Sequence, residues 1–212
     1  MKKLKENSPY NENYYKQYYI SPLVSRLRLN NIYLLYLAFF CLKIPAKLSK
    51  NSKVLDVGCG VGSMVWALRK LGVKSYGIEL SVAAKKFSQA PKFCTYKKYK
   101  KLPFKDHTFD LVYTREVLEH VESSQVDFFI KECLRVSKGT LINMICVKER
   151  GELAYSEETH VTVRSEAWWK RKFDKFGLKV TIGNKFYFFP IINEMLKGKF
   201  EKTGYFYSTL NK

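Results

Sequence analysis

The sequence is poor in acidic residues, in paired cysteines and in long apolar runs. The second and third shortages argue against a disulfide-stabilised fold and against a membrane span. It contains 19 Asp and Glu residues against 38 Lys and Arg, which gives a formal net charge of +19. A basic balance of this kind invites a nucleic-acid partner, but the lysines are spread over the whole length, and a lysine-rich surface also keeps a protein soluble. Charge alone therefore does not identify what the protein binds.

Cysteine is present, but not in a pattern that binds metal or builds a disulfide framework. The five cysteines are scattered, and no two stand in Cys-x-x-Cys spacing. Neither a zinc site nor a disulfide-stabilised fold fits this arrangement. A reducing cytoplasm is therefore the expected compartment.

The chain has no apolar run long enough for a membrane span, no internal repeat and no interdomain linker. Its most apolar stretch, residues 32–42, is shorter than the roughly 18 residues that a transmembrane helix needs. With 212 residues, of which 46% are hydrophobic, the chain is long enough for one α/β domain with a full core.

Three glycines at every second position organise the chain. A short apolar strand is expected at Val54–Val57, and directly after it come Gly58, Gly60 and Gly62. Glycines offer no side chains to a packed strand, but they let the backbone turn sharply and a ligand approach closely. Apolar residues at helical spacing over residues 64–71 then predict a helix. Strand, glycine turn and helix form the opening unit of a nucleotide-binding α/β fold.

The details of this unit argue against a dinucleotide. A dinucleotide fingerprint would need its third glycine at position 63, where this chain has Ser63. Asp56 would repel a pyrophosphate, but it suits a ligand that carries an ammonium and a sulfonium. A second strand over residues 75–79 ends in Glu79, whose carboxylate is placed to accept both hydroxyls of a ribose.

Three motifs in this order resemble the class I S-adenosylmethionine-dependent methyltransferases, over roughly residues 50 to 150. They are Asp56-x-Gly58-x-Gly60-x-Gly62 with Glu79, Leu102-Pro103-Phe104, and Leu118-Glu119-His120-Val121. The resemblance implies a Rossmann-like α/β fold: a doubly wound, seven-stranded, mostly parallel sheet with helices on both faces. It also implies S-adenosyl-L-methionine as the cofactor, bound by Asp56, Gly58, Cys59, Gly60, Gly62, Glu79, Leu80, Tyr99, Thr114 and Arg115.

One position departs from the family pattern. Many relatives carry an acid four residues before Leu-Pro-Phe, where it binds the adenine amino group, and this chain has Lys98 there. Adenine would then be held by backbone groups near Tyr99 and by apolar packing. The lysine is part of a dense basic cluster: Lys97, Lys98, Lys100, Lys101 and Lys105. This cluster is either a solvated loop or a patch near the cofactor that meets an anionic substrate.

Two parts are expected along the chain, a tyrosine-rich helical cap segment over residues 1–48 and a methyltransferase domain over residues 49–212. Residues 23–42 have a helical pattern that ends before Pro45. Basic residues beside tyrosines would suit a helix on a membrane surface, but a helix packed across the cofactor site is favoured over a membrane role. In the resembled family such helices often cover the substrate pocket, which these tyrosines could line.

The remaining elements follow from periodicity. Further strands are expected at residues 92–96, 109–113, 140–147, 178–182 and 203–210, and further helices at 82–88, at 127–136 and from the N-cap Ser165 to Gly177. Residues 148–165 are polar and are expected to form a loop over the site. The aromatic residues Trp168, Trp169 and Phe173 are expected in the core. Residues 186–192 could form a pocket wall or a partner surface.

The turn after the fourth strand carries a candidate metal site. Glu116, Glu119 and His120 lie three and four residues apart, so on a helical turn they can face one point. Two carboxylates and an imidazole form an acceptable half-site for Mg²⁺ or Mn²⁺. Glu-x-x-Glu-His also looks like the metal-binding turn of ubiquinone-pathway O-methyltransferases and small-RNA 2′-O-methyltransferases, which add a later histidine; here it would be His160. In metal-free relatives the same residues only cap and orient the turn.

These observations predict an enzyme that transfers a methyl group from S-adenosylmethionine to an acceptor. A small-molecule acceptor methylated at oxygen is favoured, with His160, His120 and Glu116 as the catalytic residues and a histidine removing the hydroxyl proton. RNA is the alternative acceptor, supported by the charge and by the Glu-x-x-Glu-His turn. A non-catalytic partner subunit with the same fold is the alternative from another class, and the intact cofactor motifs speak against it.

Overall fold

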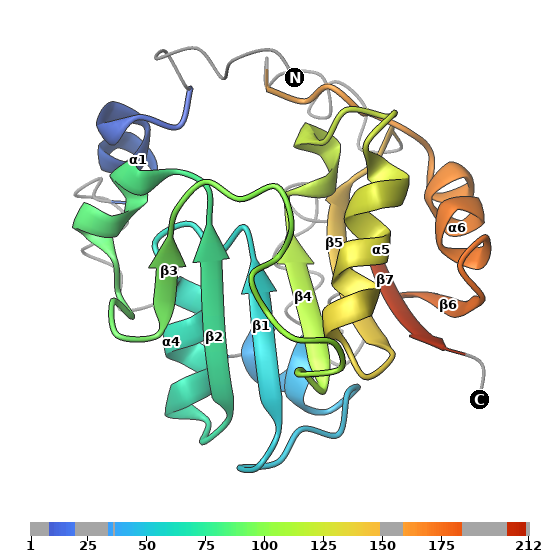
Figure 1. The fold of residues 1–212 in the computed structure, drawn as a ribbon, viewed down its shortest axis with the longest axis horizontal. Helices are drawn as coiled ribbons and strands as arrows, with labels where there is room; N and C mark the ends of the chain where they lie inside the picture. The colour runs from blue at the N-terminus through green and yellow to red at the C-terminus, as the bar shows by residue number, and fades with distance from the viewer. Residues whose placement is uncertain (1–8, 20–33, 36, 149–158, 184–202, 211–212) are drawn as a thin grey trace, which may run out of the picture.

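The computed structural model describes residues 9–19, 34–35, 37–148, 159–183 and 203–210, which form a sheet covered by helices (Figure 1). The strands are β1 (Lys53–Val57), β2 (Lys74–Glu79), β3 (Cys94–Tyr96), β4 (Leu111–Arg115), β5 (Thr140–Cys146), β6 (Leu178–Gly183) and β7 (Thr203–Leu210). The α-helices are α1 (Glu12–Tyr19), α4 (Ser63–Lys70), α5 (Val126–Val136) and α6 (Glu166–Asp174). A π-helical segment, η1 (Leu37–Lys43), and two 3₁₀ segments, η2 (Val82–Phe87) and η3 (Leu118–His120), complete the described elements.

The strand order is β3-β2-β1-β4-β5-β7-β6. The pairs β1–β2, β1–β4, β2–β3 and β4–β5 are parallel, whereas β7 runs antiparallel to both β5 and β6. This confirms the predicted seven-stranded, mostly parallel sheet. The order reverses between β1 and β4, so the loops that follow these two strands diverge and leave room for a ligand at the carboxyl edge. The arrowheads of β1, β2 and β4 point to this edge at the top of Figure 1.

Helices α5 and α6 cover one face of the sheet. Alternate strand residues such as Leu55, Val112 and Ile145 point into this layer and are at most 1% exposed. Trp169 and Phe173 of α6 are fully buried there, which confirms their predicted place in the core. The N-cap of α6 is Ser165, as predicted, and its Oγ accepts a hydrogen bond from the Trp168 amide.

Segment η1 and helix α4 cover the opposite face. Leu37, Ala38 and Leu42 are at most 1% exposed and pack with Leu68 of α4 and with Tyr113 of β4. Residues 37–43 therefore belong to a layer of the core. The sequence predicts that the helix over residues 23–42 crosses the cofactor site, and for residues 37–42 this is wrong. Their apolar side chains pack against the sheet and α4 instead.

Other elements agree with their predicted positions, with three differences. Strand β4 begins at Leu111 because Phe109 forms only an isolated bridge, to Ser137. The predicted helix over 82–88 is a 3₁₀ segment. Of the predicted loop over 148–165, the described end is partly core, since Thr162 is fully buried and donates to the Val121 carbonyl. Residues 186–192 lie outside the described residues. Among the helices that the structure describes, none has both the length and the apolarity to cross a membrane.

Candidate functional site

The glycine turn after β1 has the backbone that the sequence predicts. Gly58, Gly60 and Gly62 all have positive φ, at 76°, 52° and 76°, a region that favours glycine. The amide of Gly58 donates to the carbonyl of Ile78 in β2 at 2.8 Å, which holds the turn against the sheet. A Cβ on Gly58 would lie 2.5 Å from Cγ2 of Val117, so the turn also packs closely against the segment after β4. Helix α4 begins directly after Gly62.

Glu79 stands at the end of β2, and its carboxylate is fixed by backbone amides. Oε2 accepts from the amide of Gly60 at 2.9 Å, and Oε1 accepts from the amide of Ser81 at 2.8 Å. Each carboxylate oxygen accepts two hydrogen bonds, so both keep one position for a ligand hydroxyl. The predicted ribose acceptor is therefore held in place before any ligand binds.

Asp56 lies one strand away from Glu79 and is 3% exposed. Burial raises its pKa from 3.8 to about 7, the charge of Glu79 pushes in the same direction, and the guanidinium of Arg115 opposes the shift. A cationic group placed beside Asp56 would favour the ionised carboxylate. The geometry therefore suits a ligand with an ammonium, as the sequence predicts.

The other predicted cofactor residues are divided between the site's rim and the core. Leu80 is 43% exposed beside Glu79, and Tyr99 is half-buried, with a pKa raised by burial and then by neighbouring groups that include Glu79. Thr114 is 1% exposed, and its hydroxyl donates to Oδ1 of Asn143 at 2.8 Å inside the sheet. The hydroxyl of Thr114 is therefore bonded to β5, and the assignment of this residue to the cofactor stays a prediction.

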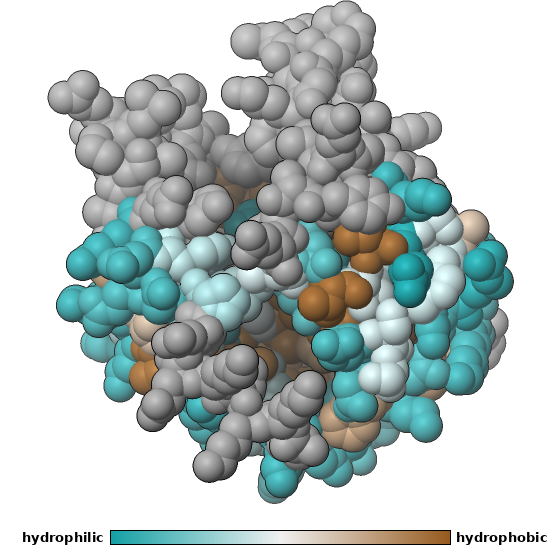
Figure 2. Space-filling view, turned by 90° about the horizontal axis from the view of Figure 1, so that it is seen from above, coloured by the Kyte–Doolittle hydropathy of each residue, from teal (hydrophilic) through white to brown (hydrophobic). Residues whose placement is uncertain are grey.

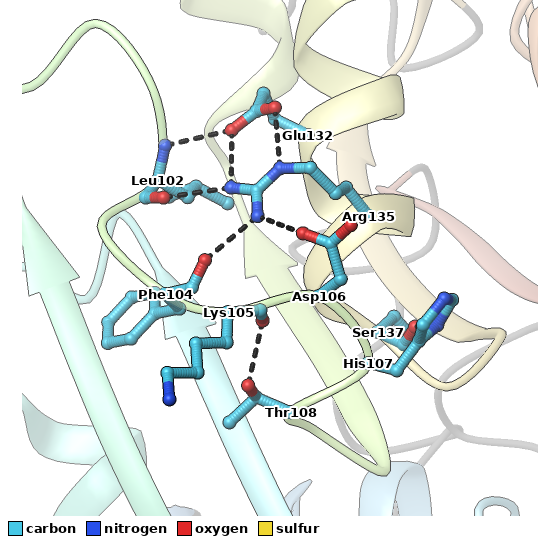
Figure 3. A network of polar contacts seen from close by, with 9 residues as sticks. All are labelled: Leu102, Phe104, Lys105, Asp106, His107, Thr108, Glu132, Arg135 and Ser137. Carbon is cyan, nitrogen blue, oxygen red and sulfur yellow. Dashed lines mark hydrogen bonds and ion pairs between the residues drawn. The ribbon is translucent and has the colours of Figure 1, made fainter.

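The Leu-Pro-Phe segment is anchored to α5 by Arg135 (Figure 3). The guanidinium donates to the carbonyls of Leu102 and Phe104, each at 2.8 Å, and to the carboxylates of Glu132 and Asp106. Glu132 in turn accepts from the Leu102 amide at 2.9 Å. This network fixes the segment from Leu102 to Asp106 against α5.

A residue that the sequence analysis did not single out, Tyr10, spans the carboxyl edge. Its hydroxyl lies 2.9 Å from Nδ1 of His120, after β4, and its carbonyl accepts from the Ser81 hydroxyl, after β2, at 2.7 Å. Tyr15 of α1 is 3% exposed and packs with Ala84 of η2. We call residues 9–19 the latch, since they join the two sides of the site. The tyrosine richness of this segment was the available signal.

His120 has the partners that fix one tautomer. Its Nδ1 also lies 2.9 Å from the carbonyl of Thr159, which can only accept. A proton on Nδ1 satisfies that carbonyl and leaves Nε2 as the basic nitrogen. The ring of His160 packs edge-on at a centroid distance of 4.8 Å. The structure thus places both predicted histidines together, whereas Glu116, with φ of 54°, is exposed on the turn.

The predicted metal quartet does not assemble as expected. The ligand atoms that lie within 4.8 Å of one another in the described part of the chain belong to Glu119, Cys146 and His160, so Glu116 and His120 are not in this group. Glu119 is fully buried, and Oε1 accepts from the Cys146 amide at 2.8 Å. The backbone carbonyl of Glu119 also accepts hydrogen bonds from the amides of Val161 and Thr162, which hold the turn against this segment.

This donor set does not fit Mg²⁺ or Mn²⁺. Both ions prefer oxygen ligands and retain bound waters, whereas here one carboxylate is joined by a thiol and an imidazole. Glu119 and Cys146 are each fully buried, so an ion bound between them would have no open coordination position for a methyl acceptor. We therefore assign no catalytic step to a metal.

The carboxyl edge, seen from above in Figure 2, is hollowed at its centre, with hydrophobic residues inside and polar residues around them. The residues of the basic cluster, Lys97, Lys98, Lys100, Lys101 and Lys105, are all exposed. Among the described residues none of these five forms an ion pair. Their charge is therefore carried by solvent-facing side chains.

Known proteins share both the sequence pattern and the fold. A norajmaline N-methyltransferase of Rauvolfia serpentina is 38% identical over 103 residues, which are 44% of this chain and 34% of the relative. A ubiquinone biosynthesis O-methyltransferase of Pelagibacter ubique is 31% identical over 125 residues, 55% of this chain and 50% of the relative. The chain thus spans half or less of the length of these two relatives.

Solved structures match over most of the chain. A chain of the complex between the Haloferax volcanii Trm112 methyltransferase activator and a methyltransferase superposes with a TM-score of 0.65 at 16% identity, covering 87% of this chain and 95% of that one. Magnesium protoporphyrin IX methyltransferase of Synechocystis with bound S-adenosylmethionine gives a TM-score of 0.61 at 16% identity, covering 86% and 80%. At these identities the match concerns the fold.

A family model described as a methyltransferase domain matches residues 55–142, which run from β1 into β5 and include the glycine turn, Glu79 and the turn after β4. This match identifies residues 55–142 as a methyltransferase domain, and the solved methyltransferase structures share its fold.

Proposed function

We propose that the protein transfers a methyl group from S-adenosylmethionine to an oxygen atom of a small-molecule acceptor. The observation that carries the cofactor half of this proposal is the carboxylate of Glu79, held by the amides of Gly60 and Ser81 beside the glycine turn. A pre-positioned acceptor of ribose hydroxyls loses little entropy when the ligand binds.

The residues that would hold the cofactor follow from the geometry. Glu79 would accept the ribose hydroxyls, the turn at Gly58 and Gly60 would lie against the amino-acid part, and Asp56 would face the ammonium. Tyr99 and the anchored Leu102 segment would border the base. When bound, S-adenosylmethionine supplies an electrophilic methyl group on a sulfonium.

The acceptor would be bound on the side of the η3 turn. His120, with its proton on Nδ1, would present Nε2 as a base for an acceptor hydroxyl, and Thr159 would hold the ring in that tautomer. The latch would limit the access of water above this turn, because Tyr10 bridges Ser81 and His120. The similarity to the Pelagibacter relative, an O-methyltransferase, supports oxygen as the acceptor atom.

The experiment is a transfer assay with methyl-labelled S-adenosylmethionine against a panel of phenols, catechols, amines and carboxylic acids. Transfer to a hydroxylated acceptor, reduced at least about tenfold in His120→Gln, supports the proposal. Retention of turnover in excess chelator is also expected, since no step passes through a divalent ion. Transfer to amines alone would contradict oxygen methylation.

RNA is a second candidate acceptor, and the five exposed lysines of the basic cluster favour it. Binding to RNA through these lysines would weaken steeply with salt, because each neutralised phosphate releases counterions. Replacement of Lys97, Lys98, Lys100 and Lys101 by Ser would then flatten the salt dependence. Weak, salt-independent binding would indicate that the basic cluster is only a solvated loop.

A non-catalytic partner subunit is the candidate from another class. Absence of transfer to every acceptor, with S-adenosylmethionine still bound, would favour this role.

A further inference from the structure

Cys59 of the glycine turn and Cys94 of β3 both border a space that a glycine of β2 leaves open. Gly77, in β2, is the register partner of Asp56 in β1 and of Cys94 in β3. A Cβ placed on Gly77 would lie 2.6 Å from Sγ of Cys59 and 2.9 Å from Sγ of Cys94. Both sulfurs therefore lie against the place where a Gly77 side chain would be, which brings them near each other over β2.

Both residues are free thiols in the structure, and they differ in exposure. Cys59 is 8% exposed, whereas Cys94 is half-buried. A hydrogen bond from the Cys59 thiol lowers the pKa of Cys94, while the same bond and burial raise the pKa of Cys59. Since the thiolate is the nucleophile, Cys94 is the residue that would react first.

A disulfide between Cys59 and Cys94 would affect the glycine turn, because Cys59 belongs to it and Cys94 contacts it. Cys59 lies between Gly58 and Gly60, whose backbone forms the turn, and its own amide donates to the Ile78 carbonyl. A Cβ on Gly62 would lie 2.8 Å from the Cys94 sulfur, so this sulfur also contacts the end of the turn. A covalent bond between the two sulfurs would fix the turn to β3 and change the distance between Gly60 and Glu79.

We propose that Cys59 and Cys94 form a thiol modification site, a dithiol that low-molecular-weight disulfides oxidise to a Cys59–Cys94 disulfide and that thiols reduce again. The Cys94 thiolate attacks one sulfur of a disulfide RSSR, which gives a mixed disulfide and releases RS⁻. Cys59, on losing its proton, attacks the Cys94 sulfur and releases the second RS⁻. The protein loses two electrons and two protons, and RSSR becomes two RSH.

The test is oxidation of the full-length protein with oxidised glutathione, followed by mapping of peptides by mass spectrometry. We expect a loss of two hydrogen atoms and a peptide pair joined between Cys59 and Cys94. Cys59→Ser should instead retain glutathione on Cys94, and Cys133→Ala, which alters a buried thiol of α5, should still form the link. Glutathione on Cys94 of the unaltered protein without the cross-link, or no reaction at the pair, would overturn the proposal.

The effect on the site is measured separately, with S-adenosylhomocysteine as the probe, and this part rests on the proposed function. Calorimetry on the cross-linked protein should show affinity reduced at least about tenfold, restored by dithiothreitol. Unchanged affinity after cross-linking would overturn the regulatory effect. If the reduced protein fails to bind the probe, the proposed function fails, while the peptide map still decides whether the dithiol exists.

Discussion

The hydroxyl of Tyr10 lies 2.9 Å from Nδ1 of His120, which follows it by 110 residues in the chain. This contact joins the N-terminal latch to the turn after β4, and the hydrogen bond from Ser81 to the Tyr10 carbonyl joins it to the end of β2. The latch therefore bridges the two sides of the cofactor site. Its docking is the part of the site that depends most on a few polar contacts.

Tyr10→Phe keeps the ring and removes the hydroxyl, and Ser81→Ala removes the other contact. A hydrogen bond of this kind contributes about 0.5–1.5 kcal/mol, so each change should raise the opening of the latch by about two- to tenfold. Hydrogen exchange of the amides of α1 measures this opening. Thr108→Val, which alters a surface hydrogen bond to the Lys105 carbonyl, is the control. Unchanged exchange in both latch variants would mean that apolar packing and the Lys86–Glu12 ion pair hold α1 without these two contacts.

Glu119 should make the protein less stable as pH rises toward neutrality. Burial, and then the charge of Glu116, raise its pKa from 4.5 to about 7, while His160 opposes the shift. The folded state thus binds the proton more tightly than the unfolded chain, so the stabilisation is complete below pH 4.5 and is lost as pH rises through 7. The loss is on the order of 3 kcal/mol.

Urea unfolding at pH 5 and pH 8 checks this effect. Glu119→Gln should reduce the difference in free energy of unfolding between the two pH values, because the amide does not titrate. Glu122→Gln alters an exposed carboxylate nearby and should keep the slope of the unaltered protein. Equal slopes in Glu119→Gln and the unaltered protein would show that this carboxylate does not titrate in the range.

Asp56 should couple cofactor binding to proton release. With its pKa raised to about 7, mainly by burial, much of the carboxyl is protonated near neutrality. A ligand ammonium binds the ionised form, so affinity for S-adenosylhomocysteine should increase by about five- to tenfold from pH 6 to pH 8. Calorimetry in two buffers with different ionisation enthalpies measures the released proton. Asp56→Asn should abolish the release, and a proton count of zero in the unaltered protein would refute the coupling.

Arg135→Lys should destabilise the fold although it keeps the charge. Lysine cannot reproduce the fork that binds Glu132, Asp106 and two carbonyls, and Glu132, at 8% exposed, would lose its two-pronged contact with the guanidinium. We expect a loss of about 2–4 kcal/mol in the free energy of unfolding, read from the denaturant midpoint at constant slope. Arg171→Lys, on the exposed side of α6, is the matched control and should change little. A similar small change at both positions would show that the network contributes little.

Much of the fold could be predicted from local patterns. The strands and α5 follow from apolar periodicity, and the glycine turn follows from the spacing of Gly58, Gly60 and Gly62, whose positive φ angles the structure confirms. Glu79 could be placed at a strand end because the apolar run stops there. These features depend on residues within a few positions of one another.

The site's remaining contacts depend on docking over long distances in sequence. Nothing in the local pattern pairs Tyr10 with His120, or shows that residues 37–43 pack on the sheet beside α4. Cys146 looks like an ordinary core residue of β5, so its place beside Glu119 could not be predicted from sequence. The hydrogen bond from the Thr114 hydroxyl to Asn143, 29 residues later, is likewise a long-range contact that local pattern does not predict.

The central claim, that the turn after β1 and Glu79 bind S-adenosylmethionine, is tested most directly by calorimetric titration with S-adenosylhomocysteine. Three proteins are compared: the unaltered chain, Glu79→Gln, and Glu122→Gln as a control for a carboxylate on the exposed surface. Glu79→Gln should lose about 1.5–3 kcal/mol of binding free energy, roughly ten- to a hundredfold in affinity, because the amide cannot accept from both backbone amides and the ribose. Glu122→Gln should bind as tightly as the unaltered chain. Equal affinity in all three proteins, or no binding to the unaltered chain, would contradict the assignment.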